Sequence, residues 1–193
     1  IRYTPTLLFY GEDGKTVLRL NGYYPPHQFL AALQYVAGKH ETKQSFRDYF
    51  AANNPTPSAG KLHPQPWLMS LPLQLSGRKS GRPLLVLFEQ KDCAGCDYLH
   101  QTILTKPESL HLIGQFDVAR VELWSNESLV TPDGARRTAR DWSRALGLVY
   151  APSAVLFDAT GKEVMRIEGM LKTFHVQSVL DYVASGQYRT QPN

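Results

Sequence analysis

The chain has 193 residues, of which 42% are hydrophobic and 20% charged, and its formal net charge is +4. This length fits one ordinary domain, or one domain with an appendage, and the apolar fraction is sufficient for a core. The 21 Lys and Arg residues are spread along the chain, which gives no support to nucleic-acid binding. No apolar run reaches the roughly 20 residues that a membrane-spanning helix needs, so we expect no membrane span.

The first 40 residues predict a hairpin followed by a helix. Thr6–Tyr10 and Thr16–Asn21 have strand composition and flank a Gly11-Glu12-Asp13-Gly14 turn. A helix is expected after Pro25-Pro26, because its apolar residues recur at helical spacing: Phe29, Ala32, Leu33 and Val36.

The next segment predicts a polar connection. Residues 43–52 favour a short helix, and residues 53–66 contain four prolines together with Gly, Ser and Asn, which is typical of a linker. Residues 67–75 are apolar but interrupted by Pro72, so we expect a strand or turn there. Residues 77–82 are expected to form a turn.

The central segment predicts alternating strands and helices. A buried strand is expected at residues 84–88, a helix after Cys93, a short helix at 107–115 and a strand at 118–124. A further helix is expected at 133–146, with the basic residues of 136–144 on its solvent face. Its buried face would carry Ala135, Ala139, Trp142 and Leu146.

The two cysteines of the chain, Cys93 and Cys96, are separated by Ala94-Gly95 and directly follow the predicted buried strand. Cys93 would lie at a helix N-terminus, where unpaired N–H groups and the helix dipole favour the thiolate. Cys96 would lie one turn further along, within reach of a mixed disulfide. The spacing therefore predicts a redox-active disulfide with Cys93 as nucleophile and Cys96 as resolving thiol.

A CxxC motif also has other uses in proteins. Structural zinc normally needs four ligands, whereas the six histidines are scattered and the best set, Cys93, Cys96 and His100, lacks a fourth member. Haem attachment needs a histidine directly after the second cysteine, and Asp97 stands there. A purely structural disulfide stays open, although closing so small a loop removes little unfolded-state entropy. We expect no cofactor and no metal.

The sequence also contains an internal repeat. An offset of 147 residues aligns residues 4–37 with 151–184 without a gap, and places Pro5 on Pro152 and Gly22 on Gly169. The second copy predicts strands at Ser153–Phe157 and Glu163–Glu168 and a helix at 173–185. Because the first copy lacks the strand and CxxC helix that precede the second, the repeat predicts a longer parent protein whose first module has lost its N-terminal half.

With strand, CxxC, helix, strand, helix, X-Pro, hairpin and helix in this order, residues 71–188 resemble a thioredoxin-like domain. They are most similar to small bacterial thioredoxin-related proteins, many of them exported. The motifs that carry the resemblance are Cys93-Ala94-Gly95-Cys96-Asp97-Tyr98, Thr131-Pro132-Asp133-Gly134, Ala151-Pro152-Ser153 and Phe157-Asp158-Ala159-Thr160-Gly161-Lys162-Glu163-Val164.

The resemblance implies the α/β class and a thioredoxin-like fold, in which helices flank a central mixed sheet. Residues 4–37 resemble the closing half of a second such domain. The implied organisation is a partial module at 1–40, a connector at 41–70 and a complete domain at 71–193. The partial module is expected to pair with its missing part or with another chain.

The resemblance further implies a thiol–disulfide oxidoreductase that acts on protein thiols and disulfides together with an unidentified redox partner protein. Pro152 would be a cis-proline lying against the dithiol, with the backbone of Ala151 free to pair with an extended peptide substrate. The alternative is a non-catalytic binding or scaffold module with an idle or structural disulfide.

The sequence departs from thioredoxin near the dithiol. Thioredoxin has a buried carboxylate six residues before its first cysteine, where this chain has Leu87, and Glu89 would share the face of Leu87 only if the strand persists. Asp92 should oppose formation of the Cys93 thiolate and Lys91 should favour it, so the direction of electron flow stays open. We expect a bacterial periplasmic location, with the cytoplasm as the alternative.

Overall fold

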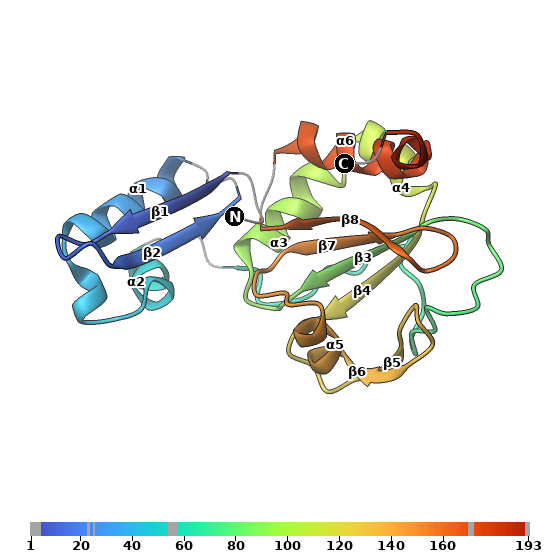
Figure 1. Cartoon of the computed structure of the whole chain (residues 1–193), viewed down its shortest axis with the longest axis horizontal. Coiled ribbons are helices and arrows are strands. Elements are labelled where there is room, and N and C mark those ends of the chain that lie inside the picture. The colour runs from blue at the N-terminus through green and yellow to red at the C-terminus, as the bar shows by residue number, and fades with distance from the viewer. Residues whose placement is uncertain (1–4, 23, 25, 54–57, 170–171, 192–193) are drawn as a thin grey trace. The chain divides into compact units, whose positions relative to one another are not determined.

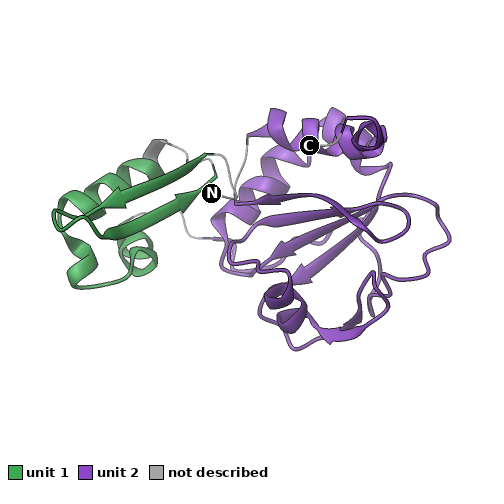
Figure 2. Ribbon diagram, in the orientation of Figure 1, with its two compact units in different colours: residues 1–57 green, residues 58–193 purple. Residues whose placement is uncertain are grey.

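The computed structural model describes residues 5–22, 24, 26–53, 58–169 and 172–191 (Figure 1). The chain divides into two compact units, residues 1–57 and 58–193 (Figure 2). Thr4, at the start of the sequence repeat, and residues 54–57 of the predicted linker lie outside the described residues.

Unit 1 consists of a two-stranded hairpin and two helices. Strands β1 (Thr6–Tyr10) and β2 (Thr16–Asn21) pair antiparallel, and they are followed by helix α1 (Pro26–Ala37), a 3-10 turn (His40–Thr42) and helix α2 (Phe46–Asn53). The hairpin and α1 confirm the elements expected from the sequence.

Aromatic contacts join α2 to the rest of unit 1. The Tyr35 ring on α1 lies 5.2 Å from that of Phe46 and 5.3 Å from that of Tyr49, measured between ring centroids. The first part of the expected connector is therefore packed into unit 1, whereas Ser58 and the residues after it belong to unit 2.

Unit 2 is built on a four-stranded mixed sheet in the order β4-β3-β7-β8. The strands are β3 (Leu84–Glu89), β4 (Asp117–Glu122), β7 (Ser153–Phe157) and β8 (Glu163–Glu168). Strand β3 is parallel to β4 and antiparallel to β7, and β7 is antiparallel to β8. All six residues of β3 are buried, as a central strand covered on both faces requires.

Helices cover both faces of this sheet (Figure 1). Leu85 and Leu87 of β3 face one way and pack in a core with Leu99, Ile103 and Leu180, while Leu84, Val86 and Phe88 pack in the opposite core with Trp142. The bounds of the helices are α3 (Ala94–Tyr98), α4 (Pro107–Ile113), α5 (Ala139–Ala145) and α6 (Thr173–Ala184). The mixed sheet flanked by helices confirms the predicted fold.

The prediction of a helix at residues 133–146 is wrong for the first part of this segment. A hairpin of β5 (Ser128–Val130) and β6 (Arg136–Thr138) occupies this segment, and α5 begins only at Ala139. The hairpin forms because Thr131-Pro132-Asp133-Gly134 makes a tight turn, with Gly134 at φ 83° and Thr131 N–H donating to the Ala135 carbonyl at 2.9 Å. Arg136 and Arg137 therefore lie on a strand rather than on a helix face.

Residues 58–75 form no strand longer than an isolated bridge. Leu68 pairs with Val118 and Gln74 with Val130, and the Leu71–Pro72 peptide bond between these bridges is cis. The strand or turn expected at 67–75 is thus an irregular segment along the edge of the sheet. Among the helices in the described parts of the chain, none is both long and apolar enough to cross a membrane.

The repeat found in the sequence is also present in the backbone. The bounds of β1, β2 and α1 each become those of β7, β8 and α6 when 147 is added to the residue numbers. Equivalent hydrogen bonds accompany them. Gly22 N–H donates to the Pro5 carbonyl at 2.8 Å, and Gly169 N–H donates to that of Pro152 at 3.0 Å.

The backbone match continues past the aligned sequence. The hydroxyl of Tyr35 donates to the Gln44 carbonyl at 2.8 Å, and that of Tyr182 donates to the Gln191 carbonyl at 2.7 Å. The repeated structure therefore extends through residues 44 and 191.

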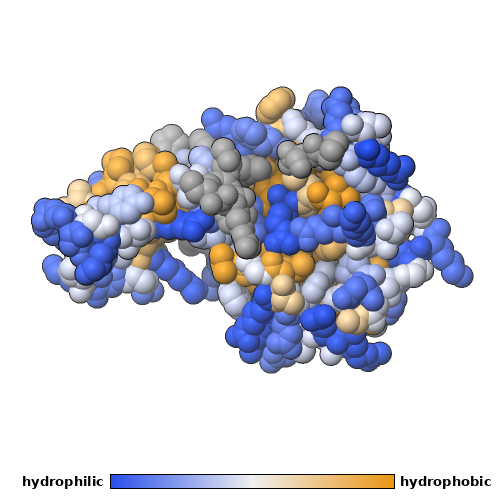
Figure 3. Space-filling view, viewed as in Figure 1, coloured by the Kyte–Doolittle hydropathy of each residue, from blue (hydrophilic) through white to orange (hydrophobic). Residues whose placement is uncertain are grey.

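The two copies differ in the burial of their apolar side chains. Leu8 is 40% exposed and Leu33 is 42% exposed, whereas their equivalents Val155 and Leu180 are 0% and 2% exposed. Figure 3 shows hydrophobic side chains gathered on the visible surface of unit 1. Among the described residues of this unit, the exposed large apolar ones are Leu7, Leu8, Tyr10, Leu30 and Leu33.

Candidate active site

The candidate site lies where β3 ends and α3 begins. Cys93 is the N-cap residue of α3, and its sulfur accepts a hydrogen bond from Cys96 N–H at 3.0 Å. The sulfurs of Cys93 and Cys96 are joined in a disulfide with an S–S distance of 2.04 Å. Both sulfurs therefore lie in the first helical turn, where free backbone N–H groups favour negative charge on sulfur.

The two cysteines differ in exposure. Cys93 is 6% exposed and Cys96 is 2% exposed, so Cys93 is the more accessible to a substrate in solution. Cys96 lies on the interior side of the helix.

Pro152, at the start of β7, is brought against this dithiol loop. The Ala151–Pro152 peptide bond is cis, in agreement with the resemblance. A Cβ at Gly95, between the two cysteines, would lie 2.9 Å from Cδ of Pro152. Glycine at position 95 thus permits a backbone approach that a side chain would block. The structure therefore brings together Cys93, Cys96, Ala151 and Pro152.

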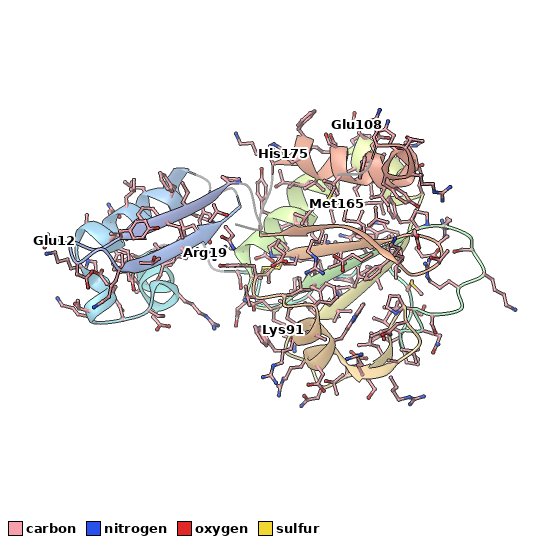
Figure 4. All side chains as sticks on the ribbon, viewed as in Figure 1. Glu12, Arg19, Lys91, Glu108, Met165 and His175 are labelled. Carbon is pink, nitrogen blue, oxygen red and sulfur yellow. A yellow bond between two sulfur atoms is a disulfide. The ribbon has the colours of Figure 1, made fainter. Side chains whose placement is uncertain are left out.

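The charged residues before Cys93 make contacts of their own. The Lys91 ammonium (labelled in Figure 4) lies 4.0 Å from the Glu122 carboxylate of β4. The exposed Asp92 accepts a hydrogen bond from the Ser58 hydroxyl at 3.3 Å. Both side chains are thus engaged with neighbouring segments.

Glu89 is a buried acid that sequence reasoning left undecided. Strand β3 persists to Glu89 and carries its side chain to the face shared by Leu85 and Leu87, where the residue is 0% exposed. Its Oε1 lies 2.6 Å from Nε2 of His100, which is 1% exposed. The other carboxylate oxygen, Oε2, has no hydrogen-bond partner among the described residues.

A second histidine–carboxylate pair packs on the first. The His63 ring stacks on that of His100 with centroids 4.9 Å apart, and His63 Nε2 lies 2.6 Å from Oδ1 of Asp97. Asp97 also accepts from Ala59 N–H at 2.7 Å, and Arg120 of β4 donates to the His63 carbonyl.

These contacts correct the prediction that residues 53–66 form a linker. Its residues from Ser58 onward pack against the helix that carries Cys96 instead of lying free. Two features of the sequence indicate the buried pair: Glu89 continues the alternation of Leu85 and Leu87, and His100 follows Cys96 by four residues, which is one helical turn.

The possible zinc ligands named from the sequence, Cys93, Cys96 and His100, do not form a metal site in the structure. The cysteine sulfurs are bonded to each other, and His100 Nε2 is directed at Glu89. Within the described ranges, no group of three or more His, Cys, Asp or Glu side chains is placed to hold a metal ion.

Fold and site together define an α/β domain in which a CxxC disulfide begins a helix against a cis-proline. The sequence model of the thioredoxin-like domain family matches residues 1–37 and 76–184, which is more than half of the chain. The chain therefore belongs to the thioredoxin-like domain family.

A solved structure shares this fold. A thioredoxin-fold protein from Helicobacter pylori superimposes with a TM-score of 0.55 at 17% identity, over 62% of this chain and 78% of that chain. A thioredoxin from Thermus thermophilus gives a TM-score of 0.46 at 21% identity, over 64% of this chain and 95% of that chain. No curated protein matches the chain.

Proposed function

We propose that the protein is a thiol–disulfide oxidoreductase that acts on protein disulfides. The observation that carries this proposal is the Cys93–Cys96 disulfide at the start of α3, held against Pro152. Membership of the thioredoxin-like family supports it.

In the reducing direction, the Cys93 thiolate attacks one sulfur of a substrate disulfide, and the other substrate sulfur leaves as a thiolate. Cys96 loses its proton and attacks the sulfur of Cys93, which releases the second substrate sulfur. Two electrons have then passed to the substrate, and the protein holds the Cys93–Cys96 disulfide. The reverse sequence oxidises a dithiol substrate, and a redox partner protein restores the starting state in either direction.

The backbone of Ala151 is proposed to bind the substrate peptide. An extended peptide beside the dithiol would pair with the main chain of Ala151, as a strand adds to the edge of a sheet. The half-buried Ala151 and the neighbouring Val149, which is 64% exposed, support this placement. An apolar residue beside the substrate cysteine would meet Val149.

Insulin reduction with dithiothreitol as the electron donor tests the proposed function. Wild type should accelerate reduction, and Cys93→Ser should abolish the acceleration. Cys96→Ser should instead accumulate a mixed disulfide at Cys93, visible by mass spectrometry. Equal rates in wild type and Cys93→Ser would overturn the proposal. A reduction potential below about −300 mV would favour the scaffold alternative, because inert structural disulfides have such potentials.

We also propose that the chain comprises a partial thioredoxin-like module at 1–40 and a complete domain at 71–193, and that the residues expected to connect them, 41–70, are divided between unit 1 and unit 2. The shared 147-residue offset of strands, helix and hydrogen bonds supports it. A periplasmic location, with the cytoplasm as the alternative, stays a prediction.

The partial module is proposed to bind an apolar strand equivalent to β3. In unit 2 the edge of β7 is paired antiparallel with β3, Val86 lying opposite Val155 and Leu85 opposite Leu156. The equivalent residues of β1 are Leu8 and Phe9, and among the described residues β2 is the only strand that pairs with β1. The exposure of Leu8 and Leu33, whose equivalents Val155 and Leu180 are buried in unit 2, supports this proposal.

Binding of a peptide to the full chain tests this proposal. The peptide has the sequence of residues 82–90 and is extended by lysines for solubility. It should bind wild type and bind Leu8→Lys at least about tenfold more weakly, since a buried lysine without a partner is costly. Equal binding by both proteins, or none by wild type, would overturn the proposal. Dimerisation of the chain that Leu8→Lys abolishes would instead identify a second copy as the occupant.

A further inference from the structure

Two acidic residues flank the dithiol loop. Asp92 directly precedes Cys93, and Asp97 directly follows Cys96. Asp97 also lies one helical turn from Cys93, because its N–H donates to the Cys93 carbonyl at 3.0 Å. Negative charge near a thiol opposes formation of the thiolate, and the thiolate is the nucleophile. Both carboxylates therefore disfavour the reactive form of Cys93.

The lysine next to this loop compensates these acids only weakly. The Lys91 ammonium lies 4.0 Å from the Glu122 carboxylate of β4, and its side chain is 61% exposed. Solvent screens the field of so exposed a charge. The positive charge of Lys91 is thus shared with an acid on the neighbouring strand, and the two flanking carboxylates are offset mainly by other groups.

One segment supplies hydrogen-bond donors to both carboxylates. This segment, residues 58–63, is called the strap below. The Ser58 hydroxyl donates to Oδ1 of Asp92 at 3.3 Å, and the Ala59 N–H donates to Oδ2 of Asp97 at 2.7 Å. Two consecutive strap residues therefore contact the residue before Cys93 and the residue after Cys96, so the strap runs beside the dithiol loop.

The other oxygen of Asp97 contacts a histidine of the strap. His63 Nε2 lies 2.6 Å from Asp97 Oδ1, and the side chains of the two residues are 11% and 13% exposed. An ionised carboxylate can only accept, so Nε2 carries the hydrogen. The ring is held in place by stacking on His100, and Arg120 donates to the His63 carbonyl. Hydrogen bonds to an ionised group are stronger than neutral ones, which makes His63 the principal donor to Asp97.

We propose that the strap sustains the Cys93 thiolate by offsetting the negative charges of Asp92 and Asp97. The proposal rests on the oxidoreductase function, because it concerns the nucleophile of that reaction. His63 acts through Asp97 and is a positioning residue, since its donor hydrogen reduces the negative potential that the carboxylate produces at the Cys93 sulfur. The family model matches residues 1–37 and 76–184, so the strap lies outside the matched residues and is a feature of this chain.

Other titratable groups lie on the elements around the dithiol loop. They are Glu89 of β3 with its partner His100, Glu122 of β4 with its partner Lys91, Arg120 of β4, and Tyr150 before the cis-proline turn. All of them are retained in the variants below. A change in the strap or in the two flanking acids is therefore measured against a constant electrostatic background.

The test is a titration of the Cys93 thiolate in the full chain, followed by its ultraviolet absorbance between about pH 4 and 9, below the range in which tyrosine ionises. Every protein carries Cys96→Ser, so that Cys93 is the only thiol. The rate of alkylation by iodoacetamide at about pH 7 gives a second measure, because only the thiolate reacts. No protein substrate is involved, so the proposed function can fail in the insulin assay while the thiolate responds to the strap as proposed.

His63→Phe keeps a ring against His100 but removes the donor to Asp97. The midpoint of the thiolate titration should rise by at least about 0.5 unit, and alkylation should slow about threefold because less thiolate is present. Asp97→Asn should move the midpoint in the opposite direction, since it removes the negative charge itself. Ser58→Ala should raise the midpoint less than His63→Phe does, because Asp92 is exposed.

A double variant separates the effect of charge from that of packing. If His63 acts through Asp97, His63→Phe should raise the midpoint by less than about 0.2 unit once Asp97→Asn is present. Lys61→Gln is the matched control, because it removes a positive charge from an exposed position of the same strap. It should also shift the midpoint by less than about 0.2 unit, since solvent and salt screen an exposed charge.

Three results would overturn the proposal. The first is an unchanged midpoint in His63→Phe. The second is a His63→Phe shift that persists in full beside Asp97→Asn, which would identify a packing effect. The third is an equal shift in Lys61→Gln, which would identify a general effect of net charge. Should His63→Phe fail to fold, the proposal is overturned if Asp97→Asn does not lower the midpoint or Ser58→Ala does not raise it.

Discussion

Gly95 and Pro152 are in contact across two distant parts of the chain, so that a Cβ on Gly95 would come within 2.9 Å of the Pro152 ring. Non-bonded carbon atoms pack best at about 3.5–4.0 Å. The dithiol loop and the X-Pro turn therefore fit together only while position 95 has no side chain.

Replacement of Gly95 by alanine should destabilise the protein. Either α3 or the Pro152 turn must shift, and such overpacking costs about 1–3 kcal/mol. Urea unfolding of the oxidised protein measures the free energy of unfolding. The control is Gly114→Ala, whose Cβ would lie at 3.4 and 3.5 Å from the His111 and Leu110 carbonyl oxygens and which should change stability by less than about 1 kcal/mol. An equal loss in both variants would contradict the steric explanation.

Trp142 should be a main anchor of the α5 face of the sheet. It is 5% exposed, and the centroid of its ring lies 5.1 Å from that of Phe88 and 6.2 Å from that of Phe157. Trp142→Ala should lower the free energy of unfolding by about 3–5 kcal/mol. Trp124, which is 48% exposed, provides the comparison: Trp124→Ala should cost about 1 kcal/mol or less. Thermal denaturation followed by circular dichroism distinguishes the two, and similar melting temperatures would count against this view of the core.

Asp117 should make stability depend on pH in the acid range. Burial opposes ionisation, but hydrogen bonds from Ser80 and Arg78 and the charges of Arg78 and Arg82 together hold the pKa of Asp117 below its ordinary value. A lowered folded-state pKa contributes stability that is present above the unfolded pKa, about 3.9, and is lost as pH falls through the folded pKa.

The free energy of unfolding should therefore fall with pH below about 4, and Asp117→Asn should flatten this dependence while lowering stability at neutral pH. Ser80→Ala, which removes one of the bonds, should give an intermediate slope. Urea titrations between pH 2 and 7 measure the slopes. Identical slopes in wild type and Asp117→Asn would show that other groups control the acid transition.

A lysine substitution should affect folding stability differently at equivalent positions of the two repeat copies. Leu8→Lys places an ammonium at a site 40% exposed and should change the free energy of unfolding by less than about 1 kcal/mol. Val155→Lys places the same group at a site 0% exposed and should prevent unit 2 from folding, since a buried charge lacks solvation. Circular dichroism of the two purified variants makes the comparison, and severe destabilisation by Leu8→Lys would mean that β1 is already covered.

The sequence predicted those elements whose boundaries depend on local chemistry. Glycine and proline delimit the hairpins, and regular apolar spacing defines α1 and α6, so the strands Ser153–Phe157 and Glu163–Glu168 were placed correctly. The dithiol at a strand-to-helix junction was predictable for the same reason.

Contacts between distant segments could not be predicted in this way. The α5 prediction began too early because Arg136 and Arg137 fit a helix as well as they fit β6, and only the turn at Gly134 decides between the two. The stacking of His63 on His100 depends on a proline-rich segment folding back onto α3, for which local sequence carries no signal. Glu89 was an ambiguous acid until the end of β3 was known.

The tyrosine hydroxyl bonds at the end of each repeat copy have a practical consequence. Tyr182, on the last turns of α6, holds the carbonyl of Gln191 and so anchors the segment that follows the helix. A purification tag, dye or surface linker is best joined beyond Gln191, where it leaves this anchor intact. Attachment before that residue would release the end of α6 and alter the immobilised protein.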